Sequence, residues 1–129
     1  MRLLLGTTNR GKLRELRALL DGVPGLVLLE PDDVGGLPAV IEDGATFEAN
    51  ARKKALKLAR ARGVATLSDD SGLEVDALDG RPGVRSARFA AVDGSSHASD
   101  ADNNRALVQA LANVPAERRS ARYRAAVAF

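Results

Sequence analysis

The fold is decided by the opening stretch of the chain, MRLLLGTTNRGKLRELRALL (residues 1–20). The leucines at 3–5 form an apolar run that is short enough to be a buried strand. A small polar loop follows, and Leu13, Leu16 and Leu20 then share one stripe of a helix. A strand, a loop and a helix in this order indicate an α/β architecture.

The same alternation of patterns continues along the chain. Further strands are expected at 26–29, 64–67, 73–78 and 119–129, a second helix at 46–62, and a third helix that closes at Pro115. Loops are expected at 31–44 and 93–102, which are rich in acidic, glycine or small polar residues. We therefore expect a single α/β domain over residues 1–129, in which a mixed sheet is flanked by helices.

Length and composition exclude several classes of protein. The chain has 129 residues, of which 45% are hydrophobic and 28% charged, as in ordinary globular proteins. It has no cysteine, which excludes disulfides, thiol catalysis and cysteine-bound metals. No apolar run approaches the roughly 20 residues that span a bilayer. The net charge of +2 suits an anionic ligand but is weak evidence for nucleic acid. These features predict a soluble, cytoplasmic protein.

The loop at 6–12 is the first candidate site. Amide groups at the start of a helix are unpaired and the helix dipole favours an anion there, and Lys12 adds a positive charge, so a phosphate chain is the expected ligand. The spacing resembles a Walker A motif, but Leu13 replaces the required hydroxyl residue, which argues against a P-loop ATPase. In the alternative interpretation, Thr8 or Asn9 only caps the helix and Lys12 is solvated.

The second candidate site is SDDSG at residues 68–72, directly after an apolar strand. Ligands of open α/β sheets bind beyond the carboxyl ends of the strands, and magnesium prefers carboxylate oxygens together with substrate phosphates. Adjacent residues of a strand point to opposite faces, so Asp69 and Asp70 serve one site in the same way only if the chain turns, which Gly72 allows. The alternative is a plain turn that ends the strand.

The third candidate site lies around the second helix. Asn50 and Lys54 are four residues apart and share one helix face, with Glu42 just before the helix. Lys57 continues this stripe, but we interpret Lys53 and Lys57 as solvated surface residues.

Other charged residues are expected to be ordinary surface groups. His97 lies in a serine-rich loop without a partner at motif spacing and is expected to be exposed. Arg81, Arg85 and Arg88 form a small basic cluster in sequence, for which plain surface charge is the favoured interpretation.

Four segments carry a resemblance to a known family. They are TTNRGKLREL (7–16), EDGATFEANARKKA (42–55), SDDSGLEV (68–75) and GRPGVRSARF (80–89). In this order and spacing the chain resembles the inosine triphosphate pyrophosphatases, also called non-canonical purine NTP pyrophosphatases. The resemblance implies a two-lobed α/β fold around a central cleft, a homodimer, and magnesium-dependent hydrolysis of ITP, dITP or XTP to the monophosphate and pyrophosphate.

The resemblance also implies roles for individual residues. Asp70 would be the catalytic base and Lys12 would stabilise the leaving group. Magnesium would be held by Glu42, Asp69 and Asp70. The substrate would be bound by Thr7, Thr8, Asn9, Arg10, Gly11, Lys12, Asn50, Lys54 and Ser71.

Two departures from the family pattern are visible. Arg85 stands where an aromatic residue is expected. Family members continue past the last strand with a Phe-Gly-Tyr-Asp-Pro stretch and a Ser-His-Arg that line the base pocket, and neither occurs in this sequence. The expectation is a chain that lacks the C-terminal part of the fold. One alternative function is therefore a non-catalytic nucleotide- or phosphate-binding fragment. A house-cleaning pyrophosphatase for modified pyrimidines is disfavoured by the segments at 68–72 and 80–88.

Overall fold

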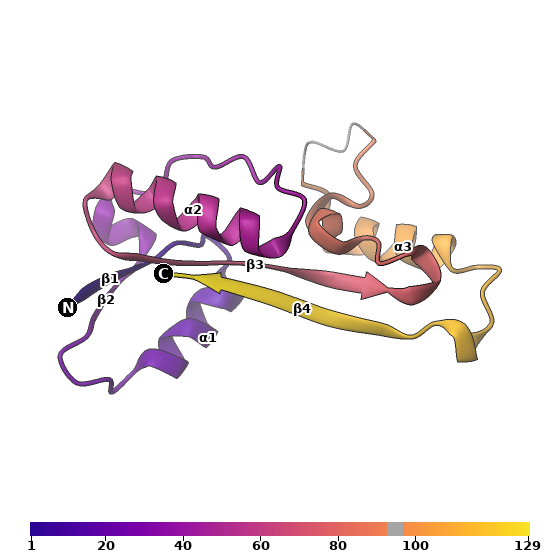
Figure 1. The fold of residues 1–129 in the computed structure, drawn as a ribbon, viewed down its shortest axis with the longest axis horizontal. Helices are drawn as coiled ribbons and strands as arrows, with labels where there is room; N and C mark the ends of the chain where they lie inside the picture. Colours follow the sequence, from indigo (N-terminus) through magenta and orange to yellow (C-terminus); the bar gives the residue numbers. More distant parts are fainter. Residues whose placement is uncertain (93–96) are drawn as a thin grey trace. The chain divides into compact units, whose positions relative to one another are not determined.

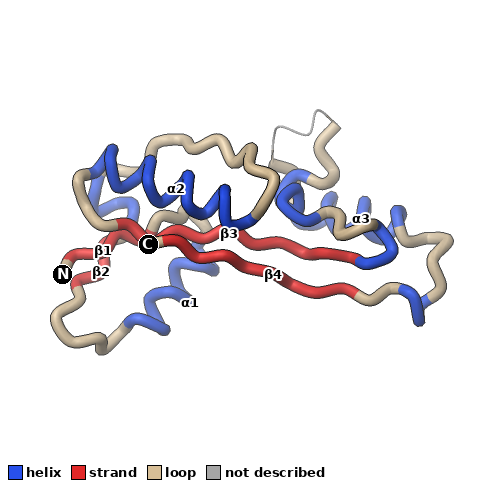
Figure 2. The backbone as a smooth tube through the Cα atoms, viewed as in Figure 1, coloured by secondary structure: helices blue, strands red, loops and turns tan. Residues whose placement is uncertain are grey.

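The computed structural model describes residues 1–92 and 97–129. Its helices and strands are, in chain order, β1 (Arg2–Leu5), α1 (Arg10–Leu20), β2 (Val27–Leu29), α2 (Phe47–Arg62), β3 (Thr66–Val75), α3 (Asp100–Ala110) and β4 (Ala121–Ala128) (Figure 1). The strands form one sheet in the order β2-β1-β3-β4 (Figure 2). Strand β1 is parallel to both neighbours, whereas β4 runs opposite to β3 (Figure 1). The predicted mixed α/β sheet is confirmed.

The chain divides into two compact units. Unit 1 comprises Met1–Asp70 and Ala126–Phe129, and unit 2 comprises Ser71–Ala125. The core of unit 1 is aliphatic apart from one ring, with Leu3, Leu4, Leu5, Leu29, Phe47, Ala51, Ala55 and Leu58 buried. The core of unit 2 is smaller and consists of Val75, Leu78 and Leu111, packed against Leu73, Leu107 and Val114. Within the described residues, no helix is long and apolar enough to cross a membrane.

The helices of unit 1 begin and end where the sequence predicts. Thr46 caps α2 by accepting a hydrogen bond from the amide of Ala49 at 3.1 Å, and Gly63 ends the helix in a left-handed conformation with φ of 63°. Helix α1 begins after Asn9. Helices α1 and α2 lie on opposite sides of the strands (Figure 1), so each side of the sheet in unit 1 is covered by one helix.

Strand β3 differs from its prediction. Instead of the two expected strands at 64–67 and 73–78 the structure has one continuous strand, Thr66–Val75, followed by a 3₁₀ helix at Asp76–Leu78. The turn considered as the alternative for residues 68–72 is therefore wrong. The physical reason is that both carboxylates have polar partners while the chain stays extended. Asp69 pairs with Lys12, and Asp70 accepts a hydrogen bond from Asn50.

Other boundaries shift by a few residues. The predicted loop at 31–44 contains a short 3₁₀ helix, Pro31–Val34. Helix α3 starts inside the predicted loop at 93–102, because Ser99 caps it by accepting from the amide of Asp102 at 3.1 Å. Residues 93–96 of that predicted loop lie outside the described residues.

The last strand is shorter than predicted. It spans Ala121–Ala128, and a 3₁₀ helix occupies Ala116–Arg118 before it. Tyr123 and Val127 in this strand and Phe129 after it are exposed. The end of β4 and the side of α2 together line a groove of about 670 Å³ in unit 1.

Candidate functional site

The site is built where β1 ends, beside the middle of β3. The two strands are parallel, with Leu5 opposite Leu67, and β3 continues past this point to Val75. The amide of Gly6 donates to the carbonyl of Leu67 at 2.7 Å, so the loop at 6–12 leaves the sheet beside Ser68. A Cβ atom on Gly6 would lie 2.2 Å from Ser68 Oγ, which requires glycine at this close approach. The loop and the acidic pair are therefore neighbours.

The start of α1 is capped by its own loop. Asn9 Oδ1 accepts from the amides of Gly11 and Lys12 at 2.9 and 3.1 Å. Thr7, which is buried, accepts from the amide of Asn9 at 3.2 Å, while Thr8 and Arg10 are exposed. The capping role considered for Asn9 is confirmed. Two of the amides expected to be unpaired are satisfied by this side chain.

Lys12 is paired with an acidic residue of the next strand. Its Nζ lies 2.5 Å from Asp69 Oδ2, and the two side chains are 30% and 11% exposed. The alternative of a solvated Lys12 is thus wrong. The other oxygen of this carboxylate, Oδ1, is buried and has no hydrogen-bond partner among the residues that the structure describes.

Asp70 interacts with α2. Its Oδ2 accepts from Asn50 Nδ2 at 2.9 Å, and Asn50 Oδ1 in turn accepts from the amide of Gly44 at 2.7 Å. Asn50 has no exposed surface, so it does not lie on an open polar face as predicted. A Cβ on Gly44 would come within 2.6 Å of Asn50 Oδ1, so the loop can approach this amide only with glycine. Asn50 therefore joins the loop that carries Glu42 to the strand that carries Asp70.

The lysines of α2 have different surroundings. Lys54 Nζ lies 2.6 Å from Glu42 Oε1, and the two side chains are 16% and 26% exposed. Lys53 pairs with Asp43, and Lys57 donates to the carbonyl of Ala39 at 2.7 Å. Lys53 and Lys57 are exposed, as predicted. Of the three lysines, only Lys54 makes a half-buried ion pair.

The electrostatics of Asp70 link these groups. Burial raises the pKa of Asp70 above its ordinary value of 3.8, and the hydrogen bond from Asn50 opposes this rise. The negative charge of Glu42 raises the pKa further, whereas Lys54 and Lys12 lower it. Asp70 therefore lies within electrostatic range of one further carboxylate, Glu42, and of two ammonium groups.

The donor set fits a cation that enters together with phosphate. In the part of the chain that is described, no three acidic or histidine side chains are grouped to hold a metal by themselves. Magnesium needs only one or two carboxylates when substrate phosphates and water complete its shell. Glu42 lies close enough to Asp70 for its negative charge to raise the pKa of Asp70, and both residues belong to unit 1. Asp69 interacts with Lys12 instead.

Small residues of the site went unrecognised in the sequence. Ser68 is fully buried and donates its hydroxyl hydrogen to the carbonyl of Gly6 at 3.3 Å. The backbone amide of Gly44 donates to Asn50 Oδ1, and a side chain at position 44 would block this contact. The sequence signal for the contact between Gly6 and Ser68 is a glycine directly after one apolar run and a hydroxyl residue directly after another.

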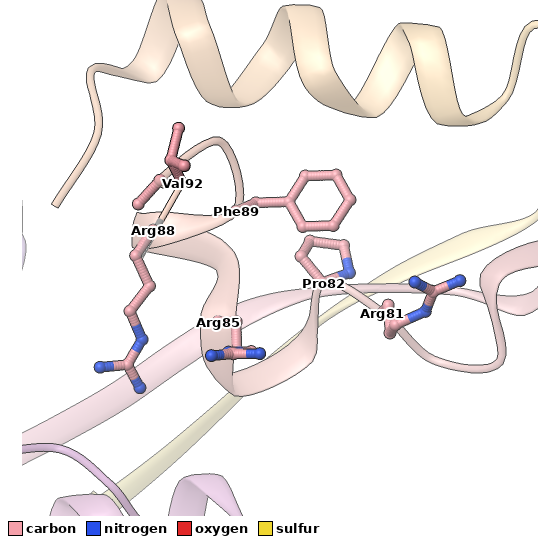
Figure 3. A pocket seen from close by; sticks show the side chains of 7 residues that line it. Arg81, Pro82, Arg85, Arg88, Phe89 and Val92 are labelled. Atoms are coloured by element: carbon pink, nitrogen blue, oxygen red, sulfur yellow. The ribbon is translucent and has the colours of Figure 1, made fainter. Parts of the chain in front are cut away.

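The remaining predicted residues belong to unit 2. Ser71 follows Asp70 along β3, and its predicted substrate contact stays a prediction. His97 is exposed, as expected. Arg81, Arg85 and Arg88 line a pocket of about 260 Å³ with Phe89, but the guanidinium groups of Arg81 and Arg88 extend to opposite sides (Figure 3). Arg81 and Arg85 are exposed, in line with ordinary surface charge.

The fold and site together define an α/β protein with a charged site where β1 ends beside residues 68–70 of the parallel strand β3. The chain belongs to the Ham1 family, whose model matches residues 3–129. A dITP/XTP pyrophosphatase of Geobacter sulfurreducens is 50% identical over 128 residues, which are 99% of this chain and 62% of that protein. A dITP/XTP pyrophosphatase of Anaeromyxobacter dehalogenans is 47% identical over 152 residues, covering 100% of this chain and 64% of that protein.

Solved structures agree with this family. A HAM1 protein from Coxiella burnetii matches with a TM-score of 0.83 at 31% identity, over 98% of this chain and 61% of its own. A nucleoside-triphosphatase / dITP/XTP pyrophosphatase from Mycobacterium abscessus matches with a TM-score of 0.75 at 41% identity, over 98% and 64%. The chain thus spans somewhat less than two thirds of the length of these relatives.

Proposed function

We propose that this chain contributes the phosphate- and metal-binding part of a pyrophosphatase that converts dITP, ITP or XTP to the monophosphate and pyrophosphate. The observation that carries the proposal is the pairing of Lys12 with Asp69 and of Lys54 with Glu42, with all but Asp69 acting electrostatically on Asp70, beside the end of β1. The names of the relatives, dITP/XTP pyrophosphatases, supply the substrate class.

The phosphate chain of the substrate is proposed to lie along the lysines. Lys12 would neutralise charge on the leaving pyrophosphate, and Lys54 would add a second positive charge along the chain. The exposed residues Thr8 and Arg10 and the start of α1 would offer further contacts, with Thr7, Asn9 and Gly11 shaping the loop. The positive end of the α1 dipole adds to this attraction.

Glu42 and Asp70 are proposed to hold magnesium. When bound there, magnesium would neutralise charge on the phosphate oxygens. Asp69 is proposed to position Lys12, since its Oδ2 forms an ion pair with the ammonium group of that lysine. Asn50 is proposed to orient Asp70 rather than to touch the substrate, because its side chain is fully buried and both ends of its amide are occupied.

The reaction needs one proton acceptor and one stabilised leaving group. A water molecule attacks the α-phosphorus, and the bond from that phosphorus to the oxygen that bridges it to the β-phosphate breaks. Asp70 takes the proton of the water as general base, and the pyrophosphate leaves with its negative charge opposite Lys12.

Oligomeric state and location are proposed from the family resemblance alone. We expect a homodimer in the cytoplasm, and light scattering of the purified chain measures the first point directly.

One observation favours a second candidate function. The chain matches only 62% of the Geobacter sulfurreducens relative, so part of that protein has no counterpart here. The alternative is a module that binds nucleoside triphosphates through their phosphates without hydrolysing them.

Product analysis separates the candidates. The chain is incubated with magnesium and dITP, XTP or dATP, and the products are quantified by ³¹P NMR. We expect pyrophosphate and monophosphate in equal amounts and little preference for dITP over dATP, since the contacts described above reach phosphate and metal only. Stepwise release of orthophosphate would contradict the proposal. Binding of all three nucleotides without hydrolysis would establish the phosphate-binding module.

A further inference from the structure

Within unit 2, the segment at 81–86 holds β3 at two points. The amide of Val75 donates to the carbonyl of Arg81 at 3.2 Å. Two residues earlier in the strand, the amide of Leu73 donates to the side chain of Ser86, whose Oγ accepts at 3.0 Å. In a regular sheet the carbonyl of a neighbouring strand would accept this second hydrogen bond. Here a side-chain hydroxyl takes its place.

The hydroxyl of Ser86 is itself held on both sides. It donates to the carbonyl of Gly83 at 2.6 Å while it accepts from the amide of Leu73. Gly72 is buried against the same group, because a Cβ atom there would lie 2.4 Å from Ser86 Oγ and 2.5 Å from the carbonyl oxygen of Gly83. The turn can approach β3 this closely only at a glycine. Ser86 therefore fixes the path of the strand at Gly72 and Leu73.

Ser71 directly precedes this contact in the strand and belongs to the same unit. It is the predicted substrate contact of unit 2. A binding group is effective only when supporting hydrogen bonds hold it within about 0.5 Å of its productive position. The position of Ser71 depends on the direction of the backbone at Gly72, which Ser86 fixes.

We propose that Ser86 is a positioning residue, which places Ser71 for its predicted contact with the nucleoside triphosphate. This inference rests on the proposed function, since it requires that the nucleotide binds. It adds a role for the segment at 80–89, which acts on binding through β3 and not through its arginines. Ser86 itself need not reach the substrate.

The first measurement tests the contact without any ligand. Ser86→Ala removes the acceptor of the Leu73 amide, so hydrogen exchange of this amide, followed by NMR, should be faster than in the wild type. An unchanged exchange rate would overturn the proposal.

The second measurement is a double-mutant cycle, in which calorimetry gives the dissociation constant of magnesium–dITP. Ser86→Ala and Ser71→Ala are each expected to weaken binding about fivefold, the typical contribution of one hydrogen bond. The double variant should bind within about twofold of Ser71→Ala alone, because Ser86 acts through Ser71. A merely structural role of Ser86 would instead weaken binding by the same factor in both backgrounds.

Ser99→Ala is the matched control, since it removes a hydroxyl of unit 2 that also accepts from a backbone amide, that of Asp102, at 3.1 Å. It should change the dissociation constant less than about twofold, and circular dichroism checks that every variant is folded. Equal factors for Ser86→Ala with and without Ser71→Ala, or equal effects of Ser86→Ala and Ser99→Ala, would overturn the inference and leave the proposed function standing. A wild-type chain that binds no magnesium–dITP would overturn both.

Discussion

The two units of the molecule use their charged residues differently. In unit 1, the side chains of the pairs Lys12–Asp69 and Lys54–Glu42 are at most 30% exposed. The charges of Lys12, Lys54 and Glu42 shift the pKa of Asp70. In unit 2, the pair of Arg122 with Asp76 has both side chains about half exposed, at 51% and 50%. Exposed pairs contribute little to stability, whereas partly buried and mutually interacting charges perturb one another and mark functional sites. The comparison supports the proposal that phosphate and cation bind in unit 1.

The largest expected effect comes from Asp70→Asn. The substitution keeps the shape and still accepts the hydrogen bond from Asn50, but it removes both the charge for the cation and the base. We expect pyrophosphate release to fall at least about 100-fold, as is typical when a general base is lost. The measurement is the initial rate with dITP and magnesium.

Asp76→Asn in unit 2 is the matched control for this variant, because it removes an equal charge from an exposed pair. It should leave the rate nearly unchanged. A near-normal rate for Asp70→Asn would show that Asp70 is a strand residue without a catalytic role.

The two units also contain comparable asparagines. Asn50 joins Gly44 to Asp70 in unit 1, and Asn103 in unit 2 accepts from the amide of Ala90 at 2.9 Å. Asn50→Leu removes the acceptor of the Gly44 amide and one hydrogen bond to Asp70, so we expect a loss of about 1–3 kcal/mol in the free energy of unfolding. Asn103→Leu should cost less, since Asn103 is only half-buried.

Urea denaturation measures both values, and the rate with dITP provides a second readout. Asn50→Leu should lower the rate as well, because it releases Asp70, whereas Asn103→Leu should lower stability only. Equal losses of activity in the two folded variants would contradict a positioning role for Asn50.

A smaller effect is expected in the pH dependence of stability. The folded-state pKa of Asp70 is raised above its ordinary value of 3.8, mainly by burial. As the pH rises from 3.8 through the raised value, the folded protein retains a proton that the unfolded chain has released, so stability falls across this window and the loss is complete above it. Asp70→Asn lacks this loss. In metal-free buffer its melting temperature should therefore exceed that of the wild type at pH 7, and the difference should vanish below pH 3.8. A wild type that is as stable as the variant at pH 7 would contradict this origin.

The smallest effect is expected for Arg122→Gln in unit 2. Its partner Asp76 also accepts from the hydroxyl of Ser120 at 2.8 Å, and the arginine is half exposed. We expect a change in the free energy of unfolding below about 1 kcal/mol, which salt diminishes further. A loss as large as that of Asn50→Leu, measured by urea denaturation, would erase the distinction between the units.

Most of the fold could be predicted from the sequence because its elements have clear periodicity and caps. Helix α2 has an apolar stripe between Thr46 and Gly63, and the structure ends it there. The prediction of two separate strands around residues 68–72 was wrong, since acidic residues and a glycine between apolar runs are typical of turns. Sequence alone does not reveal that Lys12 and Asn50, which are distant in the chain, contact the adjacent residues Asp69 and Asp70 of β3.

The charged residues of the candidate site were also named from the sequence, but their pairing was not. Motif spacing indicates which residues serve a phosphate or a cation. It does not indicate that Lys54 and Glu42 are paired with each other, because that contact depends on how the loop before α2 folds back on the helix. The burial of Asn50 likewise depends on the close approach of Gly44.

Phosphate and cation are proposed to bind in unit 1, and NMR of the ¹⁵N-labelled chain can locate them. Magnesium and tripolyphosphate are added together, and the amide shifts are compared between the two units. We expect large shifts for Gly6, Lys12, Gly44 and Asp70, and small shifts at the arginine-lined pocket of unit 2. Shifts centred on Arg81, Arg85 and Arg88, with those of unit 1 unchanged, would contradict this proposal.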